Sequence, residues 1–212
     1  IYDFDSTKKL SLDLTYFTYL AQQAGGLNDV MFETDPFQSN RSRNWFNVDW
    51  FLYNLKYEHE ITSSNIFTVS LFGLHAVRNA LGFRVNRVDQ IDSFGPRDLI
   101  HGEFNNIGAE IRYLNNYNLF GNESIFVAGS KLYFSNNFSR QGPGSDFSNA
   151  DFNFYDSEFP NYVNQSDYNY PNENISVFVE NIIKPIENLS ITPGLRLEYI
   201  DTNADGSYER IL

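Results

Sequence analysis

The chain has 212 residues, a formal net charge of −12 and no cysteine. Without thiols it has no disulfide scaffold and no thiolate metal site. Its 27 acidic and 15 basic side chains give a surface that repels phosphates, which disfavours nucleic acid, and no nucleic acid is expected as a partner. Aromatic residues make up 17% of the chain. Such enrichment is typical of barrel proteins at a membrane interface, and also of strand-rich soluble proteins.

Alternating apolar and polar side chains predict seven strands. In residues 107–113, Ile, Ala, Ile and Tyr alternate with Gly, Glu and Arg, so one face of that strand is apolar and the other polar. The predicted strands cover residues 7–23, 46–60, 65–78, 103–115, 123–136, 174–186 and about 189–200. Pro193 lies inside the last of these, where its missing N–H predicts an edge or a bulge.

The predicted connections alternate between short and long. Short turns are expected at 61–64, 115–122 and 187–188, and long outer loops at 24–45, 79–102 and 137–173. Loops of more than about 12–15 residues are uncommon in compact soluble domains. A transmembrane β-barrel, in contrast, has short turns at one end and long loops at the other.

The expected fold is therefore all-β, with antiparallel up-and-down hairpins that form part of a transmembrane β-barrel. Such a barrel implies contact with outer-membrane lipid and a location in the cell outer membrane. The same pattern leaves one alternative open, a soluble β-sandwich that binds a ligand with elaborate loops.

Several segments resemble the barrel domain of TonB-dependent outer-membrane receptors, especially the ferric-dicitrate transporter-like branch. They are Ala-Gly-Gly-Leu-Asn-Asp (24–29), Asn-Arg-Ser-Arg-Asn-Trp-Phe (40–46), Leu-Phe-Gly-Leu (71–74), Arg-Asn-Ala-Leu-Gly-Phe (78–83), Arg-Asp-Leu-Ile-His-Gly-Glu-Phe (97–104), Asn-Ile-Gly-Ala-Glu (106–110) and Ile-Thr-Pro-Gly-Leu-Arg-Leu-Glu-Tyr (191–199). The resemblance implies one partial receptor barrel over residues 1–212. Seven strands cannot close the family's 22-stranded barrel.

The same resemblance implies a function for the whole receptor, the import of a ferric chelate such as a citrate-like siderophore. Iron would enter only as part of the bound chelate, and no other cofactor is expected. The receptor would engage TonB through a plug domain that is absent from this chain. A passive porin-like channel remains an alternative.

Arginine residues gather in and next to the predicted long loops. Guanidinium groups bind carboxylates through paired hydrogen bonds, so arginines around a vestibule suit an anionic chelate. The candidate ligand-binding residues are Arg78, Arg84, Arg41, Arg43 and Arg97. Arg78 and Arg84 are the strongest candidates because they flank a strand end at the expected outer rim. The alternative is that the arginines brace the loops by pairing with Asp29, Asp35, Asp89, Asp92 and Asp98.

No motif predicts an enzyme. A Gly-x-Ser-x-Gly elbow and a phosphate-binding loop are both missing, and the three histidines lie far apart in the sequence. Residues 201–206 match the start of an EF-hand calcium loop, but position twelve is Leu212 instead of Glu. A polar hairpin loop is therefore predicted there. The aromatic residues of 137–173 fit either a ligand-gripping surface or a small core within the loop.

Overall fold

A computed structural model describes residues 1–85, 87–186 and 188–210. Its elements are β1 (Tyr2–Asp5), β2 (Lys8–Gln22), α1 (Asp29–Thr34), β3 (Trp45–Thr62), β4 (Asn65–Gly82), β5 (Asp98–Leu119), β6 (Asn122–Pro143), β7 (Asn164–Ile186), β8 (Leu189–Ile191), β9 (Gly194–Thr202) and β10 (Asp205–Arg210). In this described part, no helix is long and apolar enough to cross a membrane.

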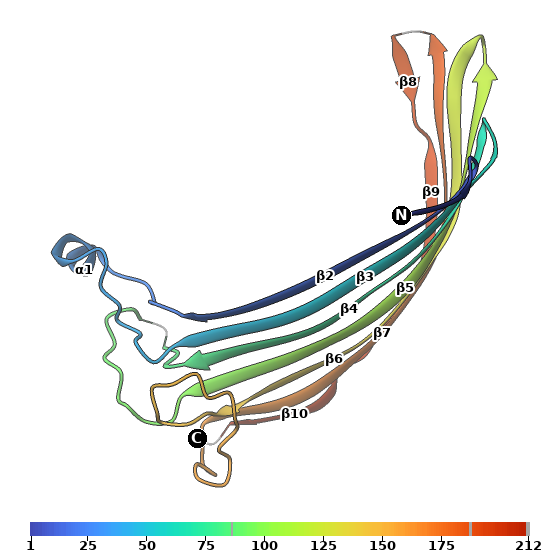
Figure 1. The fold of residues 1–212 in the computed structure, drawn as a ribbon. Helices are drawn as coiled ribbons and strands as arrows, with labels where there is room; N and C mark the ends of the chain where they lie inside the picture. Colours follow the sequence, from blue (N-terminus) through green and yellow to red (C-terminus); the bar gives the residue numbers. More distant parts are fainter. Residues whose placement is uncertain (86, 187, 211–212) are drawn as a thin grey trace.

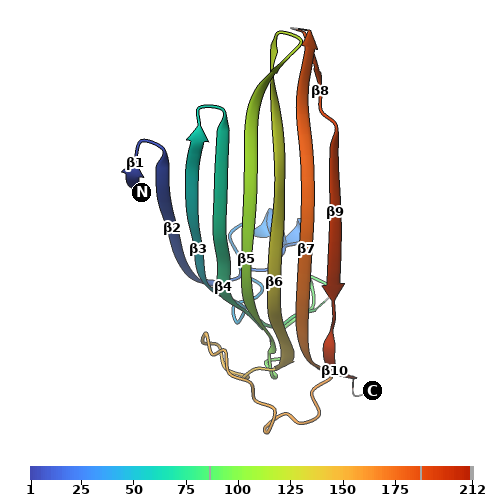
Figure 2. The same ribbon diagram turned by 90° about the vertical axis from the view of Figure 1, so that its right-hand side faces the viewer.

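The strands form one antiparallel sheet in up-and-down order, from β1 at one edge to β7 and its partners at the other (Figure 2). From β1 to β7, each strand pairs with its neighbour in sequence, and β8, β9 and β10 all pair with β7. The predicted all-β, antiparallel hairpin fold is confirmed. The structure adds β1, a short strand joined to β2 by a turn in which the Asp5 carboxylate accepts the Thr7 backbone N–H at 2.8 Å.

The last edge strand is interrupted twice. The first break, at Thr192 and Pro193, agrees with the irregularity that the proline predicted. The second break, at Asn203 and Ala204, lies where the sequence predicted a hairpin loop. That prediction is wrong, because β9 and β10 pair with the same strand in the same direction and so continue one another. Leu212, position twelve of the calcium pattern, lies outside the described residues.

The second and third long connections are shorter than predicted because the strands run beyond the apolar alternation, whereas the first keeps its predicted length and is shifted by one residue. The first, second and third loops are residues 23–44, 83–97 and 144–163. Asn79 and His101, which the sequence placed in a loop, pair between β4 and β5, and Arg140 on β6 pairs with His101. At this end, polar side chains (Asn79, His101 and Arg140) occupy the face that is apolar in the middle of the sheet, and Ala80 and Ile100 lie on the opposite face. The alternation that marks the strand in the sequence is therefore lost while the backbone ladder continues. Figures 1 and 2 show all three loops at one end of the sheet.

The opposite end carries the short connections. The predicted turn at 61–64 contracts to residues 63–64, and that at 115–122 to Phe120 and Gly121. The turn at 187–188 includes residue 187, which lies outside the described residues. Short turns at one end and long loops at the other agree with the rhythm expected from the sequence.

Register across the sheet separates two faces. One row of paired residues runs Leu12, Leu55, Leu71, Ala109, Leu132, Ile175 and Tyr199, and we call its side the apolar face. The adjacent row points the other way and runs Ser11, Lys56, Ser70, Glu110, Lys131, Ser176 and Glu198, on what we call the polar face. This opposition follows from the two-residue period of a strand.

The apolar face is the uncovered one. Leu14 is 59% exposed and Leu197 is 61% exposed, whereas the buried apolar side chains among the described residues are confined to Val48, Ala76, Leu81, Leu99 and Pro143. The described residues form no second sheet that could cover the apolar face. The soluble β-sandwich alternative is therefore wrong. In a soluble domain most large apolar side chains are buried, whereas here they are exposed on one face. A sheet of this kind requires an apolar environment outside itself.

The β5–β6 turn places two consecutive residues in the left-handed region, Phe120 at φ 54° and Gly121 at φ 83°. Positive φ at both central positions is typical of the type I′ hairpin turn, whose twist matches the flanking strands. Glycine adopts this conformation without steric cost, whereas phenylalanine does not.

We expect Gly121→Ala to lower the free energy of unfolding by about 1–2 kcal/mol, because a Cβ disfavours positive φ. A Cβ at Gly121 meets no atom within 4 Å, so the effect isolates the backbone. Gly95→Ala is the control, since its Cβ would make only ordinary contact, at 3.6 Å from Ser93 Oγ. Urea unfolding of the folded receptor measures both changes, and equal values for the two variants would contradict the assignment.

Candidate functional site

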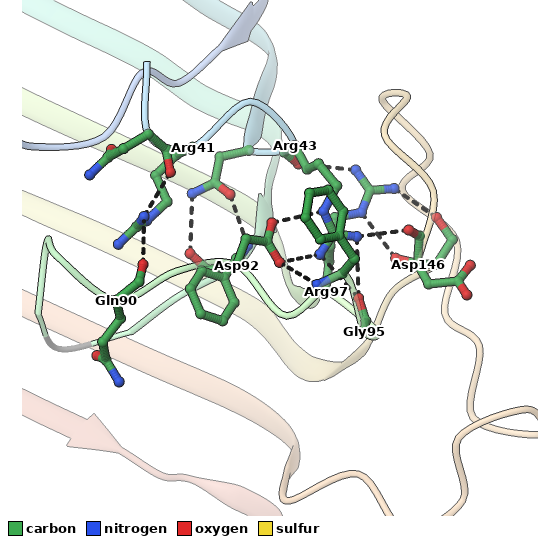
Figure 3. Close-up of polar contacts among 12 residues, drawn as sticks. Arg41, Arg43, Gln90, Asp92, Gly95, Arg97 and Asp146 are labelled. Atoms are coloured by element: carbon green, nitrogen blue, oxygen red, sulfur yellow. Dashed lines mark hydrogen bonds and ion pairs between the residues drawn. The ribbon is translucent and has the colours of Figure 1, made fainter. Parts of the chain in front are cut away.

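Three buried arginines hold the loops together at the long-loop end (Figure 3). Arg43 is 1% exposed and forms a two-pronged ion pair with Asp92 of the second loop, with Nε–Oδ2 at 2.8 Å and Nη2–Oδ1 at 2.6 Å. Its Nη1 also donates to the carbonyls of Gly95 at 3.2 Å and Asp146 at 2.7 Å. One side chain of the first loop thus binds both other loops.

Arg97 is fully buried and binds neutral acceptors. It donates to the Ser145 carbonyl at 3.0 Å and hydroxyl at 2.7 Å, the Arg43 carbonyl at 3.1 Å and the Asn149 carbonyl at 2.8 Å. Burial, and next the nearby Arg43 charge, lower the pKa of Arg97. The planar five-donor guanidinium can satisfy this set of acceptors, whereas a lysine ammonium cannot.

Arg41 connects the first and second loops. Its guanidinium donates to the backbone carbonyls of Gln90 at 3.2 Å, Arg87 at 3.2 Å and Val88 at 3.3 Å, and it stacks 5.3 Å above the centre of the Phe83 ring. The side chain is buried but still borders a cavity. Arg41, Arg43 and Arg97 therefore already have protein acceptors. Of the three, only Arg43 pairs with a carboxylate of the expected set, Asp92, whereas Arg41 and Arg97 brace the loops through neutral acceptors.

Arg78 and Arg84 are placed differently. Arg78 lies on β4, is exposed, and has its guanidinium 5.6 Å from the centre of the Phe104 ring. It makes no ion pair with any residue that the structure describes. Arg84 follows β4 in the second loop, and its side chain is 46% exposed, with Nε 3.8 Å from Asp98 Oδ2. Both guanidinium groups are therefore accessible to a ligand.

These two arginines border a cavity of about 480 Å³ under the first and second loops. Its floor is Phe46, Ala80 and Ile100, which pair in register on the polar face of β3, β4 and β5. The full lining is Gln23, Gly25, Gly26, Arg41, Asn44, Phe46, Arg78, Ala80, Leu81, Phe83, Arg84, Val85, Val88 and Ile100. The lining holds three arginines and no carboxylate, so this basic cavity favours an anion.

A second cavity of about 570 Å³ lies between the second and third loops, and Arg84 borders both cavities. Asp98 lines the second cavity and is only 8% exposed. Its carboxylate accepts Gln141 Nε2 at 2.9 Å and 3.0 Å, and the Tyr162 hydroxyl at 3.3 Å. Sequence reasoning missed Gln141, because it lay inside the predicted loop 137–173 and carried no motif. Tyr162 was one of the aromatic residues singled out in that loop, but its contact with Asp98 was not foreseen.

The aromatic residues of that predicted loop divide between several roles. Phe138, Tyr168 and Tyr170 lie on strands, and the two tyrosines stack at 5.8 Å. Phe154 of the third loop lies 3.9 Å beneath the Arg140 guanidinium, which also pairs with Asp156 at 2.6 Å. These contacts fasten the third loop to the sheet. As a separate matter, no group of three or more His, Asp or Glu residues anywhere in the described part of the chain could hold a metal ion.

An antiparallel sheet with an uncovered apolar face, short turns at one end and a basic vestibule at the other defines a segment of barrel wall. The chain belongs to the family described as TonB dependent receptor-like, beta-barrel, whose family model matches residues 2–210. This is the family that the sequence motifs indicated. No match was found among curated proteins.

The solved structures include one similar in fold, the crystal structure of the ferric citrate transporter FecA in the unliganded form. The TM-score is 0.73 at 17% sequence identity, and the likeness covers 97% of this chain. This chain spans 29% of the length of that transporter chain. The comparison therefore establishes the fold of a barrel segment.

The Arg43–Asp92 pair predicts how the loops respond to pH. Burial alone would raise the pKa of Asp92, but the Arg43 guanidinium and the Phe94 N–H outweigh it and hold this pKa below its usual 3.8. A carboxyl whose pKa is depressed by folding stabilises the fold above its unfolded pKa, and this contribution is lost as pH falls through the lower folded value.

We expect the opening free energy of residues 87–97, measured by amide hydrogen exchange, to stay constant from neutral pH to about pH 4 and to fall below that value. Arg43→Gln should weaken protection at every pH in this range, because it leaves the half-buried carboxylate without its cation. Loss of protection in the wild-type protein already at about pH 6 would contradict the role assigned to Asp92.

Proposed function

We propose that this chain forms part of the wall and outer vestibule of an outer-membrane receptor that imports a ferric chelate, with citrate-like siderophores as the first candidates. Membership in the TonB-dependent receptor family supports the receptor role, because these receptors are transporters rather than enzymes. The observation that carries the ligand class is the basic cavity, which has three arginines and no carboxylate in its lining.

Carboxylate chemistry fits the two accessible arginines. A ferric complex of a citrate-like ligand is anionic and presents several carboxylate oxygens, which guanidinium groups bind through short charge-assisted hydrogen bonds. We assign this contact to Arg78 and Arg84, whose guanidinium groups are exposed at the cavity. Arg41 adds positive charge from the wall, while Arg43 and Arg97 keep the loops in place.

Iron enters this proposal only inside the chelate. The receptor then recognises the outer oxygens of the complex and needs no metal-ligating side chains of its own. Transport through the whole receptor would be driven by TonB acting on a plug domain, and both belong to parts of the system beyond this barrel segment.

The apolar face supports a place in the outer membrane, where lipid chains would cover it. Leu132 lies in the middle of the apolar row, and the neighbouring Tyr133 points to the polar face. We expect Leu132→Arg to lower the free energy of unfolding in lipid vesicles by about 2–4 kcal/mol, the usual cost of a charge facing the bilayer midplane.

Tyr133→Arg is the matched control and should cost less than about 1 kcal/mol, because charges are tolerated on the lumenal side of a barrel. Urea titration of the full receptor in vesicles measures both variants. Equal costs at the two positions would mean that lipid does not cover the apolar face.

Ligand binding tests the two arginines directly. In the full-length receptor, we expect Arg78→Ala and Arg84→Ala each to weaken ferric citrate binding about tenfold to a hundredfold, since a hydrogen bond to a charged group contributes about 1.5–3 kcal/mol. Calorimetric titration measures the affinity.

Arg87→Ala is the control. Its side chain is 73% exposed, pairs with Asp89 in the same loop and borders neither cavity. We expect its affinity to match that of the wild-type receptor within about twofold, as is usual for an exposed ion pair. Unchanged affinity in both the Arg78 and Arg84 variants would refute the site.

A further inference from the structure

Arg84 stands at the boundary between the two cavities and already faces one anion. Its Nε lies 3.8 Å from Asp98 Oδ2, at the outer limit of an ion pair, and no hydrogen bond joins these two side chains within the described residues. With 46% of the Arg84 side chain exposed, solvent screens this pair. Arg84 is therefore weakly held and can turn toward a stronger acceptor.

Asp98, in contrast, is held firmly. Its side chain is 10% exposed, and its oxygens accept hydrogen bonds from Gln141 on β6 and from the Tyr162 hydroxyl in the third loop. These donors are neutral, so they fix the carboxylate without cancelling its charge. Asp98 stays in place when Arg84 moves.

The geometry points to Asp98 as a residue that sets the affinity of the site, an internal anion that competes with the ligand for Arg84. This inference rests on the proposed binding of an anionic chelate in the first cavity. While that cavity is empty, Arg84 faces Asp98; when a chelate enters, its carboxylate replaces Asp98 as the partner of Arg84. Asp98 thereby weakens binding of every anion, and a ligand gains by offering Arg84 a direct, short contact.

The competition has a definite signature in ferric citrate binding to the full-length receptor. We expect Asp98→Asn to bind about two- to fivefold more tightly, the range set by losing a long, solvent-screened ion pair. Asp98→Glu should have the opposite effect, because the longer side chain brings its carboxylate toward Arg84. The two variants are expected to change the affinity in opposite directions. Either variant alone tests the direction of the change if the other folds poorly.

Asp156→Asn provides the matched control. Like Asp98→Asn, it removes one negative charge, here from the third loop. Asp156, however, pairs with Arg140 and borders neither cavity. We expect no more than about a twofold change in affinity. In an Arg84→Gln background, Asp98→Asn should leave the ferric citrate affinity unchanged, because the guanidinium for which Asp98 and the ligand compete is absent.

Two binding results would overturn the inference. Weaker binding in Asp98→Asn would mean that Asp98 positions Arg84 for the ligand. A gain that persists in the Arg84→Gln background would mean that Asp98 acts only through its general field. A wild-type receptor that fails to bind ferric citrate at all would instead count against the proposed function.

A measurement without ligand separates these failures. Phenylglyoxal modifies accessible arginines, and mass spectrometry reports the rate at Arg84 alone. We expect faster modification of Arg84 in Asp98→Asn and slower modification in Asp98→Glu, with Arg87 as the internal reference. Equal rates in all three proteins would show that Asp98 does not hold Arg84, whatever the ligand is.

Discussion

The backbone ladder between neighbouring strands is the interaction on which the rest of this structure depends. Strands β2 to β7 pair along nearly their entire lengths, while few apolar side chains are buried among the described residues. A soluble domain of this size relies on a packed interior. Here the order of the sheet comes from main-chain hydrogen bonds, and the side chains adapt each face to its surroundings.

At the long-loop end, this support is replaced by a network of guanidinium groups. Arg43 and Arg97 are buried where the second and third loops meet, and they bind mainly main-chain carbonyls. Carbonyls in irregular segments lack the partners that a ladder provides, so arginine donors satisfy them. The same residue type thus serves two purposes, loop architecture at Arg43 and Arg97 and accessible charge at Arg78 and Arg84.

The strands could be predicted from sequence wherever one face was apolar, as at 107–113, but their ends could not. Around Asn79 and His101, polar side chains occupy the face that is apolar elsewhere in the sheet, so the alternation of the sequence vanishes although pairing continues. At the site, the sequence pointed to the arginines because they lie in or next to the predicted long loops of an acidic chain. Which of them are buried depends on contacts between distant loops, such as Arg43 with Asp146, and no local pattern records such contacts.

The exposed leucines and valines of the apolar face also bear on how such a chain changes over evolutionary time. A packed interior demands complementary shapes, so its residues vary together. A surface in contact with a fluid, apolar medium requires only that its side chains are apolar. Isoleucine, leucine, valine and phenylalanine are therefore interchangeable at most of its positions. Substitutions can then accumulate one by one without disturbing the architecture. This freedom gives a physical reason why two walls of the same shape share 17% of their residues.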